Sequence, residues 1–213
     1  VTKIAGILNG TTNYILTKML REGESFENSL HDARERGYAE RDPAADVEGT
    51  DALRKICILA GIAFGRHIPT EKAALCRGIT DIDKKDIAAA DKAGYAIKLL
   101  GVAETDGARA YLMVAPHLVK KGTLIADTSD VFNAVSVTGN MVGELIFYGR
   151  GAGSLPTASA VVSDIISAIR CPVPEPPRQV CEDGFAIPED EMTVKVYFRT
   201  DAPVSALSCF EGA

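Results

Sequence analysis

The spacing of the apolar residues changes at Tyr95, and this change limits the folds open to the chain. Ahead of Tyr95, apolar residues recur at the three- and four-residue spacing of amphipathic helices, which predicts helices over residues 11–20, 26–36 and 47–62. After Tyr95, short apolar runs separated by Gly, Asp and Asn turns predict strands over residues 96–103, 110–115, 133–137 and 144–148. Helices grouped ahead of strands favour an α+β fold.

Further elements are expected on both sides of this change. Residues 1–8 are typical of a strand, and residues 82–93 and 154–170 have helical spacing. We expect Gly10 and Thr11 to cap the first helix and Ser154 to cap the last one. Residues 67–80 are expected to be irregular, with a short helix over residues 71–76.

The C-terminal part differs in composition from the rest. Four prolines fall between residues 172 and 177, which predicts a linker over residues 172–191 after a domain that covers residues 1–171. Alternating apolar residues predict a strand over residues 192–199. Because little sequence follows, residues 192–213 are interpreted as a truncated segment that begins an incomplete C-terminal module.

Composition excludes several classes of function. The net charge of −6 at pH 7 argues against a nucleic-acid partner. The sequence has no apolar run of the roughly 20 residues that a transmembrane helix needs, and it shows no signal peptide. The 5 cysteines form no C-x-x-C pair and the 3 histidines have no ligand-like spacing, so we expect reduced thiols, a cytoplasmic location and no metal site.

The densest group of charged residues lies between Gly37 and Lys55. Asp46 stands where a helix cap is expected, and Asp51 and Lys55 are four residues apart on the predicted helix. An acidic loop is commonly just solvated, and the spacing alone favours an ordinary surface ion pair. Two features favour a site instead: Lys55 lies beside the apolar stripe, where partial burial is expected, and several carboxylates surround this one cation. A substrate with a free ammonium group requires such carboxylates.

A glycine-rich turn precedes the last predicted helix. Gly149, Gly151 and Gly153 invite comparison with a phosphate-binding loop. The spacing is G-x-G-x-G rather than G-x-G-x-x-G, and no βαβ unit surrounds it. On spacing alone, a tight turn into a helix is favoured.

Taken in order, these motifs resemble the homoserine dehydrogenase family. The resemblance runs from about Lys3 to Arg170 and is carried by residues 6–16, 37–55, 97–101, 147–153 and 156–165. It implies a mixed β-sheet covered by helices, in a domain for catalysis, substrate binding and dimerisation over residues 1–171. It also implies that the family's nucleotide-binding domain, with its glycine fingerprint, is missing here, so we expect the chain alone to be inactive.

The resemblance also implies roles for individual residues. Lys55 matches the family's proton donor, with Asp51 beside it as the second catalytic residue. The substrate-binding residues are expected to be Glu40, Asp46, Tyr38 and Thr11. Auxiliary contacts to the cofactor are expected from Gly151, Ala152 and Gly153.

The implied reaction interconverts L-homoserine and L-aspartate 4-semialdehyde with NAD or NADP, in the biosynthesis of threonine, methionine and isoleucine. A homodimer is implied, paired through the sheet of residues 95–148. Two alternatives stay open: a dimerisation and amino-acid-binding module without catalysis, and an unrelated α+β domain.

Overall fold

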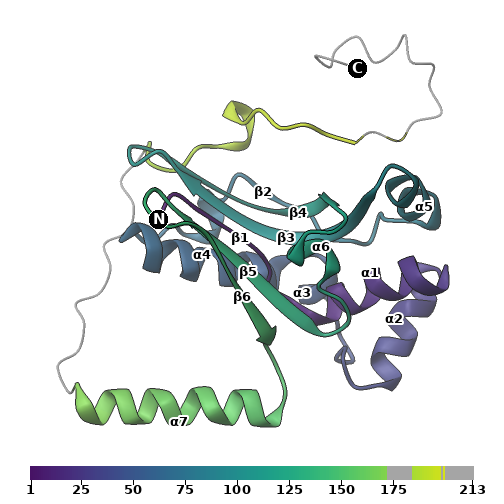
Figure 1. Cartoon of the computed structure of the whole chain (residues 1–213), viewed down its shortest axis with the longest axis horizontal. Coiled ribbons are helices and arrows are strands. Elements are labelled where there is room, and N and C mark those ends of the chain that lie inside the picture. The colour runs from purple at the N-terminus through teal and green to yellow at the C-terminus, as the bar shows by residue number, and fades with distance from the viewer. Residues whose placement is uncertain (172–183, 198, 200–213) are drawn as a thin grey trace.

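A computed structural model describes residues 1–171, 184–197 and 199. Its centre is one sheet of six strands in the order β2-β4-β3-β1-β5-β6 (Figure 1). The strands are β1 (Lys3–Ile7), β2 (Leu75–Cys76), β3 (Tyr95–Thr105), β4 (Ala110–Lys120), β5 (Phe132–Gly139) and β6 (Gly143–Arg150). Neighbouring strands of this sheet are antiparallel, except β2 and β4, which run parallel. The α+β prediction with a mixed, helix-covered sheet is therefore confirmed.

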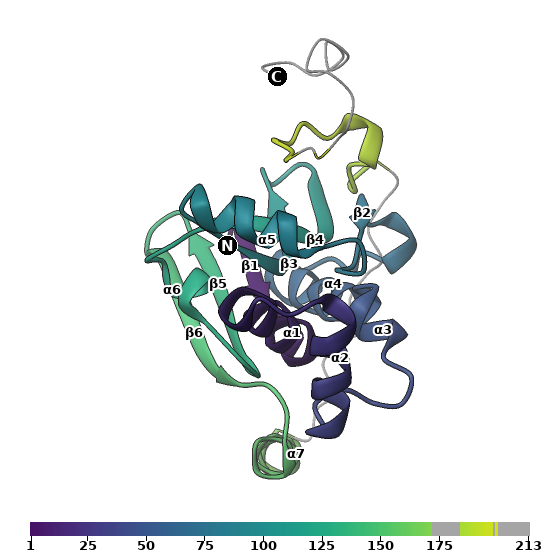
Figure 2. The same cartoon turned by 90° about the vertical axis from the view of Figure 1, so that its right-hand side faces the viewer.

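Seven α-helices and two 3₁₀ turns complete the described part of the chain. The α-helices are α1 (Gly10–Glu22), α2 (Phe26–Glu35), α3 (Ala44–Val47), α4 (Thr50–Phe64), α5 (Lys84–Lys92), α6 (Leu124–Asp127) and α7 (Ser154–Arg170), and the turns are η1 (Thr70–Lys72) and η2 (Glu189–Glu191). Figure 2 shows the β5–β6 hairpin bending beside α1, with α7 apart from the rest.

The two faces of the sheet are distinguished by the two-residue alternation of strand side chains. Leu99 and Ala103 of β3 point to the face covered by α1 and α4, where the larger buried cluster lies. Leu100 and Val102 point to the other face and join a smaller cluster with Ile125 of α6. The long continuous burial of β3 follows from having both faces covered.

Glycines set how closely α4 approaches the sheet. A Cβ at Gly101 would lie 2.8 Å from the Leu8 side chain and 3.2 Å from Ile56 of α4. Gly49, which precedes α4, has φ +86°, a backbone conformation that favours glycine. These positions bring the start of α4 beside the end of β1, where the charged residues of the site meet.

Several local predictions were wrong. The helix predicted over 47–62 is confirmed as α4 from Thr50 onwards, but its start is wrong, because the left-handed Gly49 separates Val47 of α3 from α4. The helix predicted over 71–76 is a short 3₁₀ turn followed by β2, whose backbone pairs with β4 instead. Ser154 is the first residue of α7 rather than its cap, which is Gly153.

The C-terminal segment was predicted only in part. Residues 172–183 of the expected linker and residues 200–213 of the expected module lie outside the described residues. Phe185 is buried in the larger cluster, and its carbonyl accepts a hydrogen bond from the Ala110 amide at 2.8 Å. The strand predicted over 192–199 is wrong for residues 192–197, which have no regular structure: Met192 packs against the smaller cluster, but Val194 and Val196 are exposed.

Candidate functional site

Asp51 and Lys55 form an ion pair one turn into α4. Their Oδ2 and Nζ atoms are 2.7 Å apart, and the Lys55 ammonium also donates to the Leu8 carbonyl at 3.1 Å. The expected partial burial of Lys55 was wrong, since 48% of its side chain is exposed. The cause is its position on α4: Leu53 and Ile56 face the core, whereas Lys55 points along the rim of the sheet to the end of β1. The ammonium is therefore held in place and open to solvent.

Asn9 connects this pair to the acidic loop. Its Nδ2 donates to Asp46 Oδ1 at 2.7 Å and to Asp51 Oδ2 at 2.9 Å. Its Oδ1 accepts the Thr12 amide at 2.9 Å, which fixes the orientation of the side-chain amide. Both Nδ2 hydrogens therefore point at carboxylates, and Asn9, Asp46, Asp51 and Lys55 form one continuous hydrogen-bonded group.

Sequence reasoning missed Asn9. The capping role expected of Gly10 and Thr11 belongs to Asn9, which caps α1 through its Oδ1. Asparagine is a favoured cap residue, and Asn9 stands directly ahead of the predicted helix, so this part of its role had a signal in the sequence. Its donation to two carboxylates depends on long-range contacts and had no such signal.

Asp46 has a different role from the one predicted. It lies inside α3 rather than at a cap, and its carboxylate accepts from Asn9. Asp42 instead accepts the Ala44 amide at 3.2 Å at the start of this short helix. The prediction was wrong because α3 begins earlier than the apolar spacing indicated. Asp46 is free of capping and available to the site.

Thr11 and Tyr38 hold the acidic loop against α1. The Thr11 hydroxyl donates to the Tyr38 carbonyl at 2.7 Å, and the Tyr38 ring packs edge-on against Tyr14 at 4.9 Å between centroids. The Tyr14 hydroxyl donates to Asp32. Burial and this hydrogen bond raise the pKa of Tyr14 to about 12, while the bonds from Tyr14 and Lys18 lower the pKa of Asp32 to about 2. The loop is thereby anchored to both α1 and α2.

Glu40 lies apart from the hydrogen-bonded group. Its side chain is exposed, and no hydrogen bond or ion pair joins it to another residue of the described chain. Of the six residues predicted for catalysis and substrate binding, the structure links Asp46, Asp51 and Lys55 directly, links Thr11 and Tyr38 to each other, and leaves Glu40 separate.

A cavity of about 260 Å³ connects Lys55 with the glycine turn. It is lined by Leu8, Lys55, Ile58, Leu59, Asn133 and Gly151. Gly151, Ala152 and Gly153 are exposed, and of these three only Gly151 lines the cavity. Lys55, the predicted proton donor, and Gly151 of the predicted cofactor turn therefore line the same cavity. A larger cavity of about 560 Å³ lies beside residues 71–74 and 184–191 and contains none of the predicted site residues.

Within residues 1–171, 184–197 and 199, no group of His, Cys, Asp and Glu is placed to hold a metal ion. Cys57, Cys76 and Cys171 are free thiols, and burial raises the pKa of Cys57 to about 11. None of the described helices has the length and apolar character needed to span a bilayer.

Comparison with known proteins identifies the family of this chain. The profile of the homoserine dehydrogenase family matches residues 1–166. A homoserine dehydrogenase of Synechocystis sp. is 49% identical over 173 residues, covering 79% of this chain and 40% of that protein. One from Neisseria gonorrhoeae is 42% identical over 211 residues, covering 95% of this chain and 48% of that protein.

Solved structures give the same result. A homoserine dehydrogenase from Thiobacillus denitrificans superposes with a TM-score of 0.78 at 40% identity, covering 90% of this chain and 44% of that one. A hyperthermophilic archaeal homoserine dehydrogenase in complex with NADPH superposes with a TM-score of 0.67 at 27% identity, covering 82% of this chain and 49% of that one. The chain thus spans less than half the length of these relatives. Over the part that it spans, the chain belongs to the homoserine dehydrogenase family.

Proposed function

We propose that this chain is the substrate-binding and catalytic portion of a homoserine dehydrogenase. The reaction is the interconversion of L-homoserine and L-aspartate 4-semialdehyde with NAD or NADP, in the cytoplasmic biosynthesis of threonine, methionine and isoleucine. The proposal rests on the hydrogen-bonded group of Asn9, Asp46, Asp51 and Lys55. Lys55 of this group lines one cavity together with Gly151 of the glycine turn.

Lys55 acts on the substrate oxygen in this proposal. When the aldehyde is reduced, negative charge develops on its oxygen, and a positioned ammonium stabilises that charge and donates a proton. Asp51 and the Leu8 carbonyl each accept one hydrogen bond from the ammonium, leaving its third hydrogen for the substrate. Asp51 is thus a catalytic residue that orients Lys55.

The amino-acid end of the substrate is bound by the acidic loop. A substrate ammonium needs carboxylates, and Asp46 and Glu40 supply two of them. Tyr38 and Thr11 keep the loop attached to α1 by the hydrogen bond between them. Asn9 keeps Asp46 at a fixed distance from Lys55 through its two Nδ2 bonds. The substrate is therefore oriented by its ammonium, with its oxygen directed to Lys55.

The nicotinamide supplies the hydride when it is bound. Gly151, Ala152 and Gly153 are proposed to contact it, because this turn faces the cavity that Lys55 lines. The described sheet contains a single parallel pair, β2–β4, and so lacks the parallel βαβ arrangement of a dinucleotide site. These residues therefore fit an auxiliary contact, and the chain alone is proposed to be inactive until a nucleotide-binding portion is supplied.

A homodimer is part of the same proposal. Met141, Val142, Leu145 and Phe147 are large apolar side chains exposed on the β5–β6 hairpin. Contiguous exposed apolar residues mark interaction surfaces, and a second copy pairing across the sheet would cover them. Every residue of α7 is at least partly exposed, including its apolar stripe of Val161, Val162 and Ile165. We propose that α7 packs on the nucleotide-binding portion.

The experiment that tests the function restores the nucleotide-binding portion. This chain is fused to the portion that its Synechocystis relative carries ahead of these motifs, giving an assembled enzyme. We expect nicotinamide reduction that depends on L-homoserine, with no activity for D-homoserine or for Lys55→Met. Binding of L-homoserine without any nicotinamide reduction, in an assembled enzyme that binds NADP or NAD, would favour the alternative of a non-catalytic dimerisation and amino-acid-binding module.

A further inference from the structure

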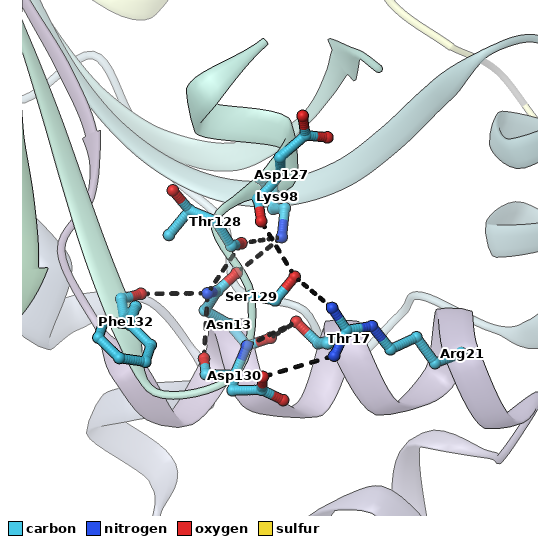
Figure 3. Close-up of polar contacts among 9 residues, drawn as sticks. All are labelled: Asn13, Thr17, Arg21, Lys98, Asp127, Thr128, Ser129, Asp130 and Phe132. Carbon is cyan, nitrogen blue, oxygen red and sulfur yellow. Dashed lines mark hydrogen bonds and ion pairs between the residues drawn. The ribbon is translucent and has the colours of Figure 1, made fainter. Parts of the chain in front are cut away.

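Lys98 is a buried lysine that the proposed mechanism does not use. It lies on the central strand β3 with only 3% of the residue exposed. Its ammonium donates to Asn13 Oδ1 at 3.0 Å and to the Thr128 carbonyl at 2.5 Å (Figure 3). Both acceptors are neutral, and no carboxylate of the described residues forms an ion pair with it. A charge is costly to bury without a partner of opposite sign, so its retention on this strand calls for a reason.

Lys98 acts together with α1 on the segment 127–132, which connects α6 to β5. Asn13 Nδ2 donates to three carbonyls of this segment, those of Thr128, Asp130 and Phe132, at 3.0–3.2 Å. Because Asn13 Oδ1 accepts from Lys98, the ammonium also fixes which way the Asn13 amide points. Lys98 therefore orients the residue that binds most of the segment.

The segment has a conformation that needs such support. Asp130 has φ +57°, the one positive φ of a non-glycine residue in the described chain. This conformation is costly for a residue with a side chain. The Asp130 amide donates to Thr17 Oγ1 at 3.2 Å, and Arg21 reaches Ser129 at 3.0 Å and Asp130 at 3.4 Å. Figure 3 shows these contacts surrounding the segment from the side of α1.

The segment leads directly into the cavity that Lys55 lines. Phe132 stacks on Tyr148 with 5.2 Å between ring centroids, and the Arg150 guanidinium lies 4.9 Å above the Phe132 ring. The next residue, Asn133, lines the cavity with Lys55 and Gly151. A Cβ at Gly151 would lie 2.8 Å from Asn133 Nδ2, so the Asn133 side chain packs on the glycine turn.

We propose that Lys98 is a positioning residue for the dehydrogenase reaction: its buried ammonium fixes the segment 127–132 and thereby holds Asn133 and the Gly151 turn at the cavity that Lys55 lines. This inference rests on the proposed function. Lys98 itself is too deeply buried to touch the substrate, so it acts through Asn13, Thr128 and the start of β5.

The electrostatics of the cluster are consistent with this role. Burial and, to a smaller extent, the nearby positive charge of Arg21 lower the pKa of Lys98 to about 8, against the opposing effect of Asp127 and Asp130. The side chain is therefore mainly an ammonium at neutral pH. The two carboxylates act from a distance, because the atoms that Lys98 touches are neutral oxygens.

The test compares Lys98→Met with the wild type. In the assembled enzyme, we expect the turnover number to fall about tenfold, because the cavity wall is displaced from Lys55, while KM for L-homoserine changes by less than about twofold. In this chain alone, we expect amide hydrogen exchange at Asp130 and Phe132 to become about tenfold faster, with an unchanged melting temperature. Lys92→Met, at an exposed lysine on α5, is the matched control and leaves all four quantities unchanged.

The results that would contradict the role proposed for Lys98 can be told apart from a failure of the proposed function. Unchanged turnover, or unchanged exchange at Asp130 and Phe132, overturns the inference. A lower melting temperature with faster exchange throughout the sheet also overturns it, because Lys98 would then be a general structural residue. If the assembled wild type has no activity, the proposed function fails, and the exchange comparison still decides whether Lys98 fixes the segment.

A second variant covers the case in which Lys98→Met does not fold. Thr17→Val keeps the shape of the side chain and removes the acceptor of the Asp130 amide. We expect the same loss of turnover and the same local increase in exchange, to a smaller degree. Wild-type behaviour of folded Thr17→Val would overturn the inference, because loosening the segment would then have no effect on the reaction.

Discussion

Lys55 and Lys98 each donate a hydrogen bond to a backbone carbonyl, but their surroundings are opposite. Lys55 has 48% of its side chain exposed and pairs with a carboxylate at 2.7 Å. Lys98 is 3% exposed and bonds only neutral oxygens. An exposed, oriented ammonium can meet a substrate, whereas a buried one can only organise the protein around it. The comparison separates the lysine proposed to act on the substrate from the lysine proposed to position the site.

The two lysines also differ in what their charge costs. The Lys55 charge stays largely hydrated, so the ion pair with Asp51 adds little to stability and mainly sets direction. The Lys98 charge is removed from water, and its pKa of about 8 records that cost. The same functional group therefore costs little free energy of folding at Lys55 and opposes folding at Lys98.

The largest expected effect is the loss of turnover in Lys55→Met. Removing the group that stabilises the developing oxygen charge is expected to lower the turnover number of the assembled enzyme by about 10²-fold or more. KM for L-homoserine should change little, because the substrate ammonium is bound by the acidic loop. Steady-state kinetics with varied L-homoserine measures both constants.

Arg54→Met is the matched control for this prediction. Arg54 is the neighbouring exposed cation on α4, and its loss removes the same charge from the same helix. Near-equal kinetic constants for Lys55→Met and Arg54→Met would show that Lys55 contributes only surface charge. The proposed contrast between a catalytic Lys55 and a positioning Lys98 would then be wrong.

The next effect is the pH dependence of stability due to Lys98. Its folded-state pKa of about 8 lies below the ordinary lysine value of 10.5, so between these values the unfolded state holds a proton that the folded state has lost. The free energy of unfolding therefore rises with pH across this window, by about 3 kcal/mol for the full shift. Below about pH 8 both states are protonated, and the cost of the buried charge is fully present.

Denaturant unfolding of the wild type and Lys98→Met at several pH values checks this linkage. The difference between them should grow in favour of the wild type from pH 8 upwards, since the titrations of other groups cancel. Near neutral pH the variant should have about wild-type stability, because losing the buried charge offsets leaving Asn13 Oδ1 without its donor. A difference that does not change with pH would mean that Lys98 is not a buried cation.

How much of the fold the sequence predicted depends on the range of the contacts. The strand β3 and the helices α2 and α7 were predicted closely, because alternation and helical spacing are local patterns. Residues 192–197 have the same alternation without strand structure, since a strand also needs a partner. The break at Gly49 was missed because glycine adopts positive and negative φ about equally well, so the residue type alone does not predict the φ of +86°.

The site was predicted to a similar extent. Asp51 and Lys55 are four residues apart on one helix, and this local spacing correctly predicted their ion pair. Asn9 and Lys98 carry no such pattern: each gains its role from partners at least 30 residues away, apart from the bond of Asn9 to α1. Lys98 within a run of apolar strand residues was the one available signal, because a lysine is rarely fully buried.

A smaller loss of turnover is expected for a substitution at Asn9, which tests whether the orientation of Lys55 depends on this residue. Asn9→Asp keeps the cap of α1 but replaces a donor by a third negative charge beside Asp46 and Asp51. We expect turnover to fall about tenfold at neutral pH, because repulsion separates the carboxylates that orient Lys55. The deficit should shrink as the pH falls, since the introduced carboxyl group becomes a donor when it is protonated.

Asn9→Ser is the control for this variant. Serine also caps helices well but is too short to reach both carboxylates and adds no charge. Its turnover should be reduced less than that of Asn9→Asp and should show no recovery at lower pH. Parallel pH profiles for the two variants would mean that the bridge between Asp46 and Asp51 does not govern Lys55.

The smallest effect is expected for Glu40, the predicted site residue that stands apart from the bonded group. Glu40→Gln removes one charge from an exposed side chain that contacts no other described residue, so stability should not change. If Glu40 binds the substrate ammonium, KM for L-homoserine should rise about fivefold with little change in turnover, since a solvent-accessible ionic hydrogen bond contributes about 1 kcal/mol. Glu35→Gln, at an exposed carboxylate at the end of α2, should leave KM unchanged. A loss of turnover at constant KM would instead assign Glu40, like Lys55, to the chemical step.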